Sequence, residues 1–285
     1  MVSGWCSRSW TDINIDFTNN SVKHCCKALS EPIINSYNNN PNILQRRKDS
    51  FNNIKNVQCK SCWDEYDNYG SAFRDYWNEW TSLDDFDDDW KYLQVKFDNI
   101  CNLSCIYCNA VDSSRIAAEK DIKINNLYND QSKRMFYQWI QEENINNKLI
   151  SILGGEPTIS SNVLDFIEFL SKTKYNDMIN LNINTNGVTI GILKDRFFNL
   201  INNLPKSWIF TIVISNESTT RSPLIRYGLD TNIFWQNFEW YATSPNVNYV
   251  GLNPCLSKFS VKEIADYLER CCEIVSKSNK NFWIH

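Results

Sequence analysis

Residues 92–108 read YLQVKFDNICNLSCIYC, a strand-like segment followed by three closely spaced cysteines. These cysteines, Cys101, Cys105 and Cys108, form a CxxxCxxC triplet. Eleven cysteines scattered over 285 residues would produce roughly 0.02 such triplets by chance. The triplet therefore indicates a site that uses several thiols together.

Strand and helix patterns alternate from residue 89 onward. Strands are expected at residues 92–97, 148–153, 180–184, 208–214, 248–252 and 281–284. Helices are expected near residues 112–121, 131–142, 161–173, 191–203, 231–242 and 261–277. Such alternation implies a parallel sheet with right-handed crossovers. Six units predict an α/β fold, a partial (β/α)6 TIM-like barrel over residues 89–285, rather than a closed eight-stranded barrel.

The unusual polar and glycine-rich sequences directly follow the predicted strands. They read Gly154-Gly155-Glu156-Pro157, Asn184-Thr185-Asn186-Gly187, Ser215-Asn216-Glu217 and Asn253-Pro254 after the second to fifth strands. The cysteine triplet follows the first strand in the same way. Parallel α/β folds place their chemistry at the carboxyl ends of the strands, so one shared site is expected there.

Three thiolates on one short loop can hold three irons of a 4Fe–4S cube, because soft thiolate ligands suit iron–sulfur clusters and zinc. The fourth iron then stays open to a chelating ligand from outside the protein. A structural zinc site requires four ligands. The three-residue spacing and the lack of a fourth ligand in this loop disfavour zinc.

On these residues the chain resembles the radical S-adenosylmethionine (radical SAM) enzymes. The resemblance rests on Cys101, Cys105 and Cys108, with Tyr107 as the aromatic residue before the last cysteine, and on the GGEP segment at residues 154–157. It implies a partial barrel, a 4Fe–4S cluster and S-adenosylmethionine bound to the open iron. It also implies reductive cleavage to a 5′-deoxyadenosyl radical, which abstracts hydrogen from a substrate, and an electron donor such as a flavodoxin or ferredoxin.

The resemblance also implies roles for individual side chains. Gly154 and Gly155 permit close backbone approach to the ligand. Glu156, followed by Pro157, is expected to accept a hydrogen bond from the methionyl ammonium group. The remaining expected cofactor contacts are Thr185, Asn186, Ser215, Glu217 and Arg226.

Two of these assignments have alternatives. Thr185 and Asn186 are expected to contact the ribose or adenine, but an Asn-Gly pair at a strand end is equally typical of a turn. Arg226 is expected to pair with the methionyl carboxylate, and the alternative is a surface salt bridge.

Residues 1–88 are expected to form a small, irregular, cysteine-rich module. A strand at 10–17, a turn at Asn20 and a returning strand at 22–25 predict a hairpin, and residues 43–54 predict a helix. The acidic run at 84–89 is expected to be a linker. Four cysteines of this module are candidate metal ligands, namely Cys6, Cys25, Cys59 and Cys62.

Their order resembles the twitch and SPASM modules that accompany radical SAM cores. This resemblance implies a second, auxiliary 4Fe–4S cluster. Cys26 remains an alternative to Cys25, and a zinc ribbon remains an alternative to the cluster. Of the other cysteines, Cys271 and Cys272 are expected to pack in a helix, and Cys255 to face the active-site end.

Composition excludes several classes of function. Lys and Arg number 29 against 33 Asp and Glu, so no basic footprint for nucleic acid is present. No apolar stretch approaches about 20 residues, and residues 1–10 lack a signal core, which predicts a cytoplasmic protein without a membrane segment. The substrate stays open between a peptide side chain, a small molecule and a nucleoside. The alternative of another class is a non-catalytic zinc-binding module.

Overall fold

The computed structural model describes residues 5–33, 37–38, 40–79, 89–124, 127–174, 177–278 and 280–284. The chain forms two compact units, Met1–Val95 and Lys96–His285. The acidic run at 84–89, which the sequence predicts as a linker, lies outside the described residues except for Asp89.

A parallel sheet forms the centre of the second unit. Among the described residues its strands are, in spatial order, β6 (Leu149–Leu153), β7 (Asn180–Thr185), β8 (Ile209–Ile214), β10 (Tyr249–Leu252) and β11 (Asn281–Ile284). Each strand lies beside the one that follows it in the sheet and in the chain, so the sheet grows in one direction, as in a barrel. The first predicted strand is β4 (Tyr92–Lys96), which reaches the boundary between the units.

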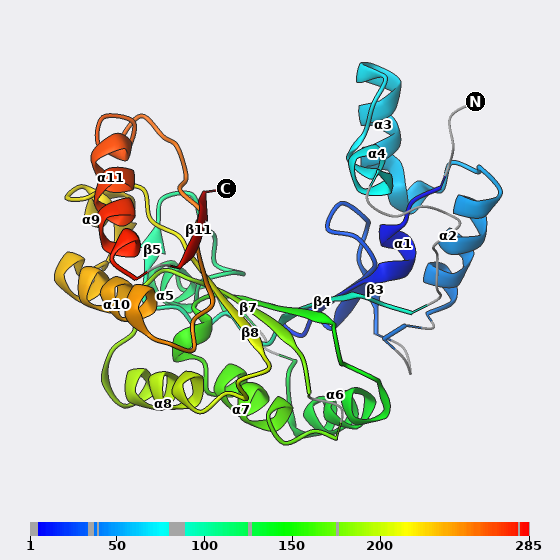
Figure 1. The fold of residues 1–285 in the computed structure, drawn as a ribbon. Coiled ribbons are helices and arrows are strands. Elements are labelled where there is room, and N and C mark those ends of the chain that lie inside the picture. Colours follow the sequence, from blue (N-terminus) through cyan, green and yellow to red (C-terminus); the bar gives the residue numbers. More distant parts are fainter. Residues whose placement is uncertain are drawn as a thin grey trace. The chain divides into compact units, whose positions relative to one another are not determined.

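Helices connect these strands at the predicted positions. They are α5 (Ser114–Glu119), α6 (Asp130–Glu142), α7 (Ser161–Leu170), α8 (Gly191–Asn202), α10 (Thr231–Thr243) and α11 (Ile264–Ser276). Two shorter turns of helix, η2 (Pro157–Ile159) and α9 (Ser222–Ile225), follow β6 and β8. Helices α6, α7 and α8 lie along one face of the strands (Figure 1). The predicted α/β fold with a parallel, partial barrel is confirmed.

Strand β7 shows how sequence periodicity sets the two faces of the sheet. Leu181 and Ile183 are fully buried, whereas Asn180, Asn182 and Asn184 alternate with them and point to the opposite face. Because successive side chains in a strand alternate, the asparagines share one polar face that leads to the carboxyl end of the strand.

A small second sheet joins two distant segments of the same unit. Strand β5 (Ser104–Cys105) pairs antiparallel with β9 (Arg226–Tyr227), and Cys105 stands opposite Arg226. This pairing connects residues 121 positions apart and fixes the arginine beside the cysteine loop.

The first unit contains the predicted hairpin. Strands β1 (Asp12–Asp16) and β2 (Ser21–Lys23) pair antiparallel, and Asn20 adopts a φ of 53° in the turn between them. Asparagine tolerates this left-handed conformation better than most residues do. Strand β3 (Glu31–Pro32) pairs with β2.

Helices make up more of the first unit than the sequence indicates. The predicted helix is α2 (Pro41–Phe51), and α1 (Arg8–Thr11), η1 (Val57–Cys59), α3 (Lys60–Tyr69) and α4 (Phe73–Asn78) accompany it. The expectation of an irregular module is therefore wrong for residues 57–78. Gly70 ends α3 at a φ of 74°, a conformation that suits glycine.

No helix in the described part of the chain is both long enough and apolar enough to cross a membrane.

Candidate functional site

A cavity of about 380 Å³ lies at the carboxyl ends of the parallel strands in the second unit. The predicted site residues that line it are Cys101, Cys105, Tyr107, Cys108, Gly154, Gly155, Thr185, Asn186, Ser215 and Arg226. Glu156, Pro157 and Glu217 do not line it. The structure thus brings most of the predicted core residues together at the expected edge of the sheet.

The three cysteines of the core lie on a loop that backbone hydrogen bonds hold closed. The Cys108 amide donates to the Cys105 carbonyl (3.0 Å), and the Cys101 amide donates to Ser114 Oγ (3.1 Å) at the start of α5. Burial raises the pKa of Cys101 to about 12 and also raises the pKa values of Cys105 and Cys108. A metal centre must therefore displace the thiol protons when it binds.

Gly154 and Gly155 place the loop after β6 against the backbone of the cysteine loop. A Cβ atom on Gly155 would overlap the Ile100 carbonyl oxygen and lie 2.6 Å from the Asn99 carbonyl oxygen. Gly154 has a φ of 141°, and a Cβ there would lie 2.9 Å from the Asp98 carbonyl oxygen. The backbone at these glycines thus makes the expected close approach, and the group that it approaches in the structure is the backbone of residues 98–100.

The Glu156 side chain is buried and bonded to the protein. Its Oε1 accepts from the Thr158 amide (3.1 Å), the Thr158 hydroxyl (2.6 Å) and the Thr185 hydroxyl (2.7 Å), and its Oε2 accepts from the Asn186 amide (2.6 Å). Burial raises the pKa of Glu156, and these hydrogen bonds oppose that rise. The carboxylate thus caps η2 and ties it to the end of β7, and its contact with a methionyl ammonium group stays a prediction. Pro157 is buried at the start of η2.

Thr185 and Asn186 line the cavity and also shape the turn after β7. The Gly187 amide donates to Thr185 Oγ1 (3.0 Å), and the Val188 amide donates to Asn186 Oδ1 (2.8 Å). Asn186 Nδ2 donates to Asn102 Oδ1 (2.9 Å) on the cysteine loop. Thr185 and Asn186 therefore do form a turn, as the alternative predicts, and this turn connects the end of β7 to the cysteine loop through Asn102.

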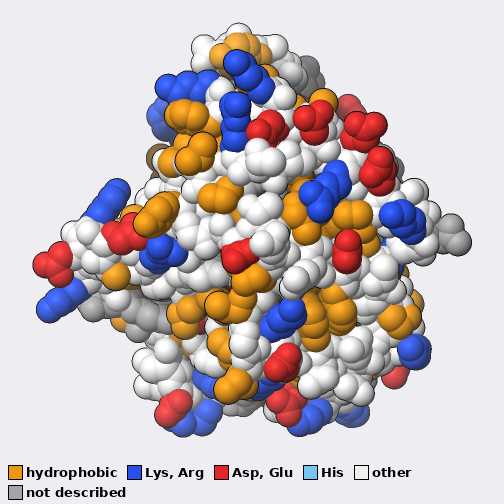
Figure 2. Space-filling view, turned by 90° about the vertical axis from the view of Figure 1, so that its left-hand side faces the viewer, with side chains coloured by type: hydrophobic (Ala, Val, Ile, Leu, Met, Phe, Trp, Pro, Cys, Tyr) orange, Lys and Arg blue, Asp and Glu red, His pale blue; other side chains and the backbone are white. Residues whose placement is uncertain are grey.

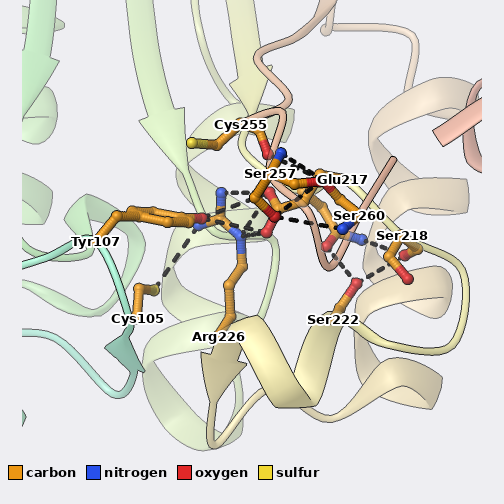
Figure 3. Close-up of polar contacts among 10 residues, drawn as sticks. Cys105, Tyr107, Glu217, Ser218, Ser222, Arg226, Cys255, Ser257 and Ser260 are labelled. Carbon is orange, nitrogen blue, oxygen red and sulfur yellow. Dashed lines mark hydrogen bonds and ion pairs between the residues drawn. The ribbon is translucent and has the colours of Figure 1, made fainter. Parts of the chain in front are cut away.

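Figure 3 shows Arg226 between Cys105 and Glu217. Arg226 Nε lies 3.1 Å from both Glu217 oxygens, and its second terminal nitrogen, NH2, lies 2.8 Å from Oε2. The remaining nitrogen, NH1, is 3.9 Å from Cys105 Sγ, and the Tyr107 hydroxyl donates to Glu217 Oε1 (3.2 Å). Burial alone lowers the pKa of Arg226, but the charge and hydrogen bonds of Glu217 together with the charges of Tyr107 and Cys105 outweigh it, and the pKa lies above its usual value. Both side chains are buried, so the surface salt bridge alternative is wrong.

Glu263 holds the loop that carries Glu217. Its oxygens accept from the Thr220 hydroxyl (2.8 Å), the Thr220 amide (3.1 Å), the Arg221 amide (3.2 Å) and the Ser218 hydroxyl. The Ser218 bond and the others lower the pKa of Glu263 to about 2. The residue immediately before α11 thus anchors the loop after β8.

Sequence reasoning missed two charged residues of this cavity. Lys96 and Asp112 line it and form an ion pair (2.6 Å). Lys96 occurs at the carboxyl end of a predicted strand, so the positional rule that marked the segment at Asn184 could have identified it. Asp112 stands at the start of a predicted helix and carries no such signal.

A second cavity, of about 30 Å³, lies in the first unit. Cys6, Cys25, Cys59 and Cys62 all line it, whereas Cys26 is exposed and does not. The structure thus places Cys25, rather than Cys26, with the other three cysteines.

The remaining cysteines lie apart from both groups. Cys271 is buried in α11 as expected, but Cys272 is exposed, so core packing holds for only one of the pair. Cys255 lies near Tyr107 without lining the cavity (Figure 3). Within the described residues, no three His, Cys, Asp or Glu side chains are gathered as ligands of a single metal ion.

Comparison with known proteins gives matches to one family. Residues 95–240, just over half of the chain, match the family model of the radical SAM superfamily. The GTP 3′,8-cyclase of Haemophilus ducreyi is 29% identical over 92 residues, which cover 32% of this chain and 25% of that protein. The chain therefore spans a quarter of the length of this curated relative.

Solved structures with some likeness include anSMEcpe with bound AdoMet and SuiB of Streptococcus suis bound to S-adenosylmethionine. The anSMEcpe match has a TM-score of 0.49 at 20% identity and covers 68% of this chain and 52% of that one. The SuiB match has a TM-score of 0.43 at 12% identity and covers 86% and 56%. Members of the matched family are enzymes that bind a 4Fe–4S cluster and S-adenosylmethionine. By its family match over residues 95–240, this chain belongs to the radical SAM superfamily.

Proposed function

We propose that the core cavity binds a 4Fe–4S cluster and S-adenosylmethionine, and that the chain catalyses hydrogen abstraction from a substrate. One observation carries this proposal: three thiols, a glycine pair and the polar ends of β6, β7 and β8 line the same cavity. The donor set fits the cluster, because three soft thiolates serve three irons and leave one open. Gly154 and Gly155 let the loop after β6 lie directly against the cysteine loop, so that both loops line the cavity.

Each side chain then has a defined task. When bound, the cluster and S-adenosylmethionine supply the electron transfer and the 5′-deoxyadenosyl radical that the family uses. Cys101, Cys105 and Cys108 hold the irons. Arg226 offers NH1 to a carboxylate, since its other nitrogens are bonded to Glu217. Tyr107 packs beneath that guanidinium, whose carbon lies 5.2 Å from the ring centre.

The first unit is proposed to hold the auxiliary 4Fe–4S cluster on Cys6, Cys25, Cys59 and Cys62. The four thiols share one cavity. The Lys27 amide donates to Cys25 Sγ (3.4 Å), and the Arg74 backbone hydrogen-bonds Cys62. Hydrogen bonds to ligand sulfurs are one of the means by which proteins tune such clusters. Eleven free thiols also suit the reducing cytoplasm, where a flavodoxin or ferredoxin is the proposed electron donor.

A peptide side chain is the proposed substrate, as the twitch-type order of the first-unit cysteines implies. A nucleotide is the second candidate, because GTP 3′,8-cyclase matches 92 residues of the chain. The surface agrees with a substrate other than nucleic acid. Figure 2 shows Lys and Arg side chains interspersed with Asp and Glu among hydrophobic ones, so that neither sign covers this face.

Cleavage of S-adenosylmethionine under anaerobic reduction tests the proposal. The wild-type chain is expected to form 5′-deoxyadenosine, and the Cys105→Ala variant to form none, because the cube loses a ligand. Cys272→Ala, an exposed cysteine of α11, is the matched control and should retain activity. Retained activity in Cys105→Ala would refute the assignment. Deuterium transfer into 5′-deoxyadenosine from labelled peptides or from labelled GTP then separates the two substrate classes.

A further inference from the structure

The second cavity contains a buried arginine among its thiols. Arg46 lines the cavity together with Cys6, Cys25, Cys59 and Cys62, and it is only 1% exposed. It lies on α2, whose buried face consists of Ile43, Arg46, Arg47 and Ser50. Positions three and four apart form one face of a helix, and core positions on such a face are almost never arginine unless the charge is paired.

Arg46 has no partner among the residues that the structure describes. All three of its guanidinium nitrogens are buried without a hydrogen bond, and the structure shows no ion pair for it. Burial of an uncompensated charge is strongly unfavourable. The neighbouring Arg47 differs, because its guanidinium donates to the Ser9 carbonyl (2.9 Å) and to Asn38 Oδ1 (2.8 Å) and does not line the cavity.

Further positive charge surrounds the same cavity. Arg74 also lines it and is 2% exposed, and two of its guanidinium nitrogens are buried without a hydrogen bond. Its charge is partly satisfied by the Trp63 ring, whose centre is 3.7 Å from the guanidinium carbon, and by Asp75 at 3.6 Å. Lys27 is a third cation in the lining, and it pairs with Glu65 (2.7 Å), which does not line the cavity. The cavity therefore combines four thiols with an excess of positive charge.

A metal centre on four thiolates supplies the charge that is needed. The four negative thiolates outweigh the two positive charges of an oxidised 4Fe–4S core or of a zinc ion, so either centre is an anion. Its sulfur atoms accept hydrogen bonds, which a buried guanidinium with free donors can provide. The charge, the hydrogen-bond donors and the position of Arg46 therefore all suit contact with such a centre.

We propose that Arg46 compensates the negative charge of the four-thiolate metal centre and raises its reduction potential. The proposal rests on the auxiliary cluster of the preceding section. One-electron reduction makes an anionic cluster more negative, so a nearby buried cation stabilises the reduced form more than the oxidised form. Arg46 thereby favours this centre as an electron acceptor. It acts through the metal centre and is a positioning and tuning residue rather than a catalytic one.

The test isolates the first-unit centre in the full-length chain. A background in which Cys101, Cys105 and Cys108 are all Ser removes the core cluster. This protein is reconstituted anaerobically with ferrous iron and sulfide, alone and with Arg46→Gln, Arg46→Lys or Arg47→Gln. Iron and sulfide content and an EPR-monitored redox titration are measured for each. Arg47→Gln removes a second buried arginine of the same helix, one that does not itself line the cavity and reaches it through a bond to the Ser9 carbonyl.

Arg46→Gln is expected to shift the midpoint potential to more negative values, while Arg46→Lys and Arg47→Gln stay near the background protein. Loss of iron from Arg46→Gln but not from Arg46→Lys also supports the proposal, because the lysine keeps the charge. An unchanged potential in Arg46→Gln overturns it. So does equal loss of iron from both Arg46 variants, since the charge is then not the property that matters.

A different result identifies failure of the auxiliary cluster itself. If the background protein takes up zinc but no iron–sulfur cluster, the second cluster is wrong and Arg46 is tested on zinc. Competition with a chromophoric chelator should then show zinc affinity about tenfold to a hundredfold lower in Arg46→Gln, the usual effect of losing a group that supports metal ligands. Unchanged zinc affinity overturns the proposal. A background protein that binds neither metal overturns both.

Discussion

At the scale of single residues, Gly155 has the narrowest tolerance in the core site. A methyl group there would overlap two backbone carbonyl oxygens of the cysteine loop. Backbone atoms cannot relieve the overlap by changing rotamer, as a side chain can. Gly155→Ala should therefore push the two loops apart, at a cost of about 1–3 kcal/mol, and reduce core iron content. Gly191→Ala is the control, because a Cβ there meets no atom within 4 Å although φ is 65°. Equal iron content in both variants would contradict this reading.

Glu156 is predicted to act on stability. Glu156→Gln replaces one acceptor oxygen with an NH2 group, which is itself a donor. The buried donors of Thr158, Thr185 or Asn186 that faced this oxygen then have no acceptor. The loss is about 1–3 kcal/mol, and thermal melting of the metal-free chain should show a Tm lower by several degrees. An unchanged Tm together with weaker S-adenosylmethionine binding would instead support a direct contact between Glu156 and the cofactor.

The hydrogen bonds of Glu156 also show what sequence can establish about a site. The GGEP segment indicated the right loop, and the strand-end rule placed it at the right edge. Which side of the loop faces the cavity depends on distant partners, and Thr185 is 29 positions away. No local sequence pattern shows that a hydroxyl on the next strand will donate a hydrogen bond to the carboxylate.

At the scale of elements, the loop after β8 depends on Glu263 at the start of α11. The pKa of Glu263 is about 2 in the folded chain, below the value of about 4.3 for an unfolded glutamate. A lowered pKa means that the carboxylate contributes stability above about pH 4.3 and loses that contribution as the pH falls toward 2. The Tm difference between wild type and Glu263→Gln should therefore shrink from pH 6.5 to pH 3.5. A difference that stays constant over this range would exclude the role.

Elements with a strong local pattern were predicted well, and those made by distant pairing were not. The six strand–helix units follow from alternation along the chain. The β5–β9 pair has two residues in each strand and joins segments 121 positions apart, so no periodicity indicates it. Helices α3 and α4 are short and bury few residues, so the sequence at 59–78 carries little helical periodicity and an irregular segment is predicted there.

At the scale of the whole molecule, the two cysteine groups predict two independent metal centres. The reconstituted wild-type chain should hold about eight irons, and Cys59→Ala/Cys62→Ala about four, while retaining some cleavage of S-adenosylmethionine. The core cysteines form their own site, so loss of the first-unit ligands leaves them in place.

The choice between Cys25 and Cys26 gives the matched control for this count. Cys25→Ala should lose about as much iron as the double variant, whereas Cys26→Ala should lose none, because Cys26 does not line the cavity. If Cys25→Ala keeps its iron and Cys26→Ala loses it, Cys26 rather than Cys25 is the fourth ligand.

The buried arginines of the first unit also affect the lifetime of the chain in a cell. Without a metal anion, Arg46 and Arg74 are charges held away from water, which lowers the free energy needed to open α2 and α4. Proteases cleave chains in proportion to how often such segments open. The proposed metal centre therefore predicts that chains loaded with metal resist proteolysis longer than chains without it. If the first unit holds the proposed cluster, a shortage of iron is expected to shorten the lifetime of the protein.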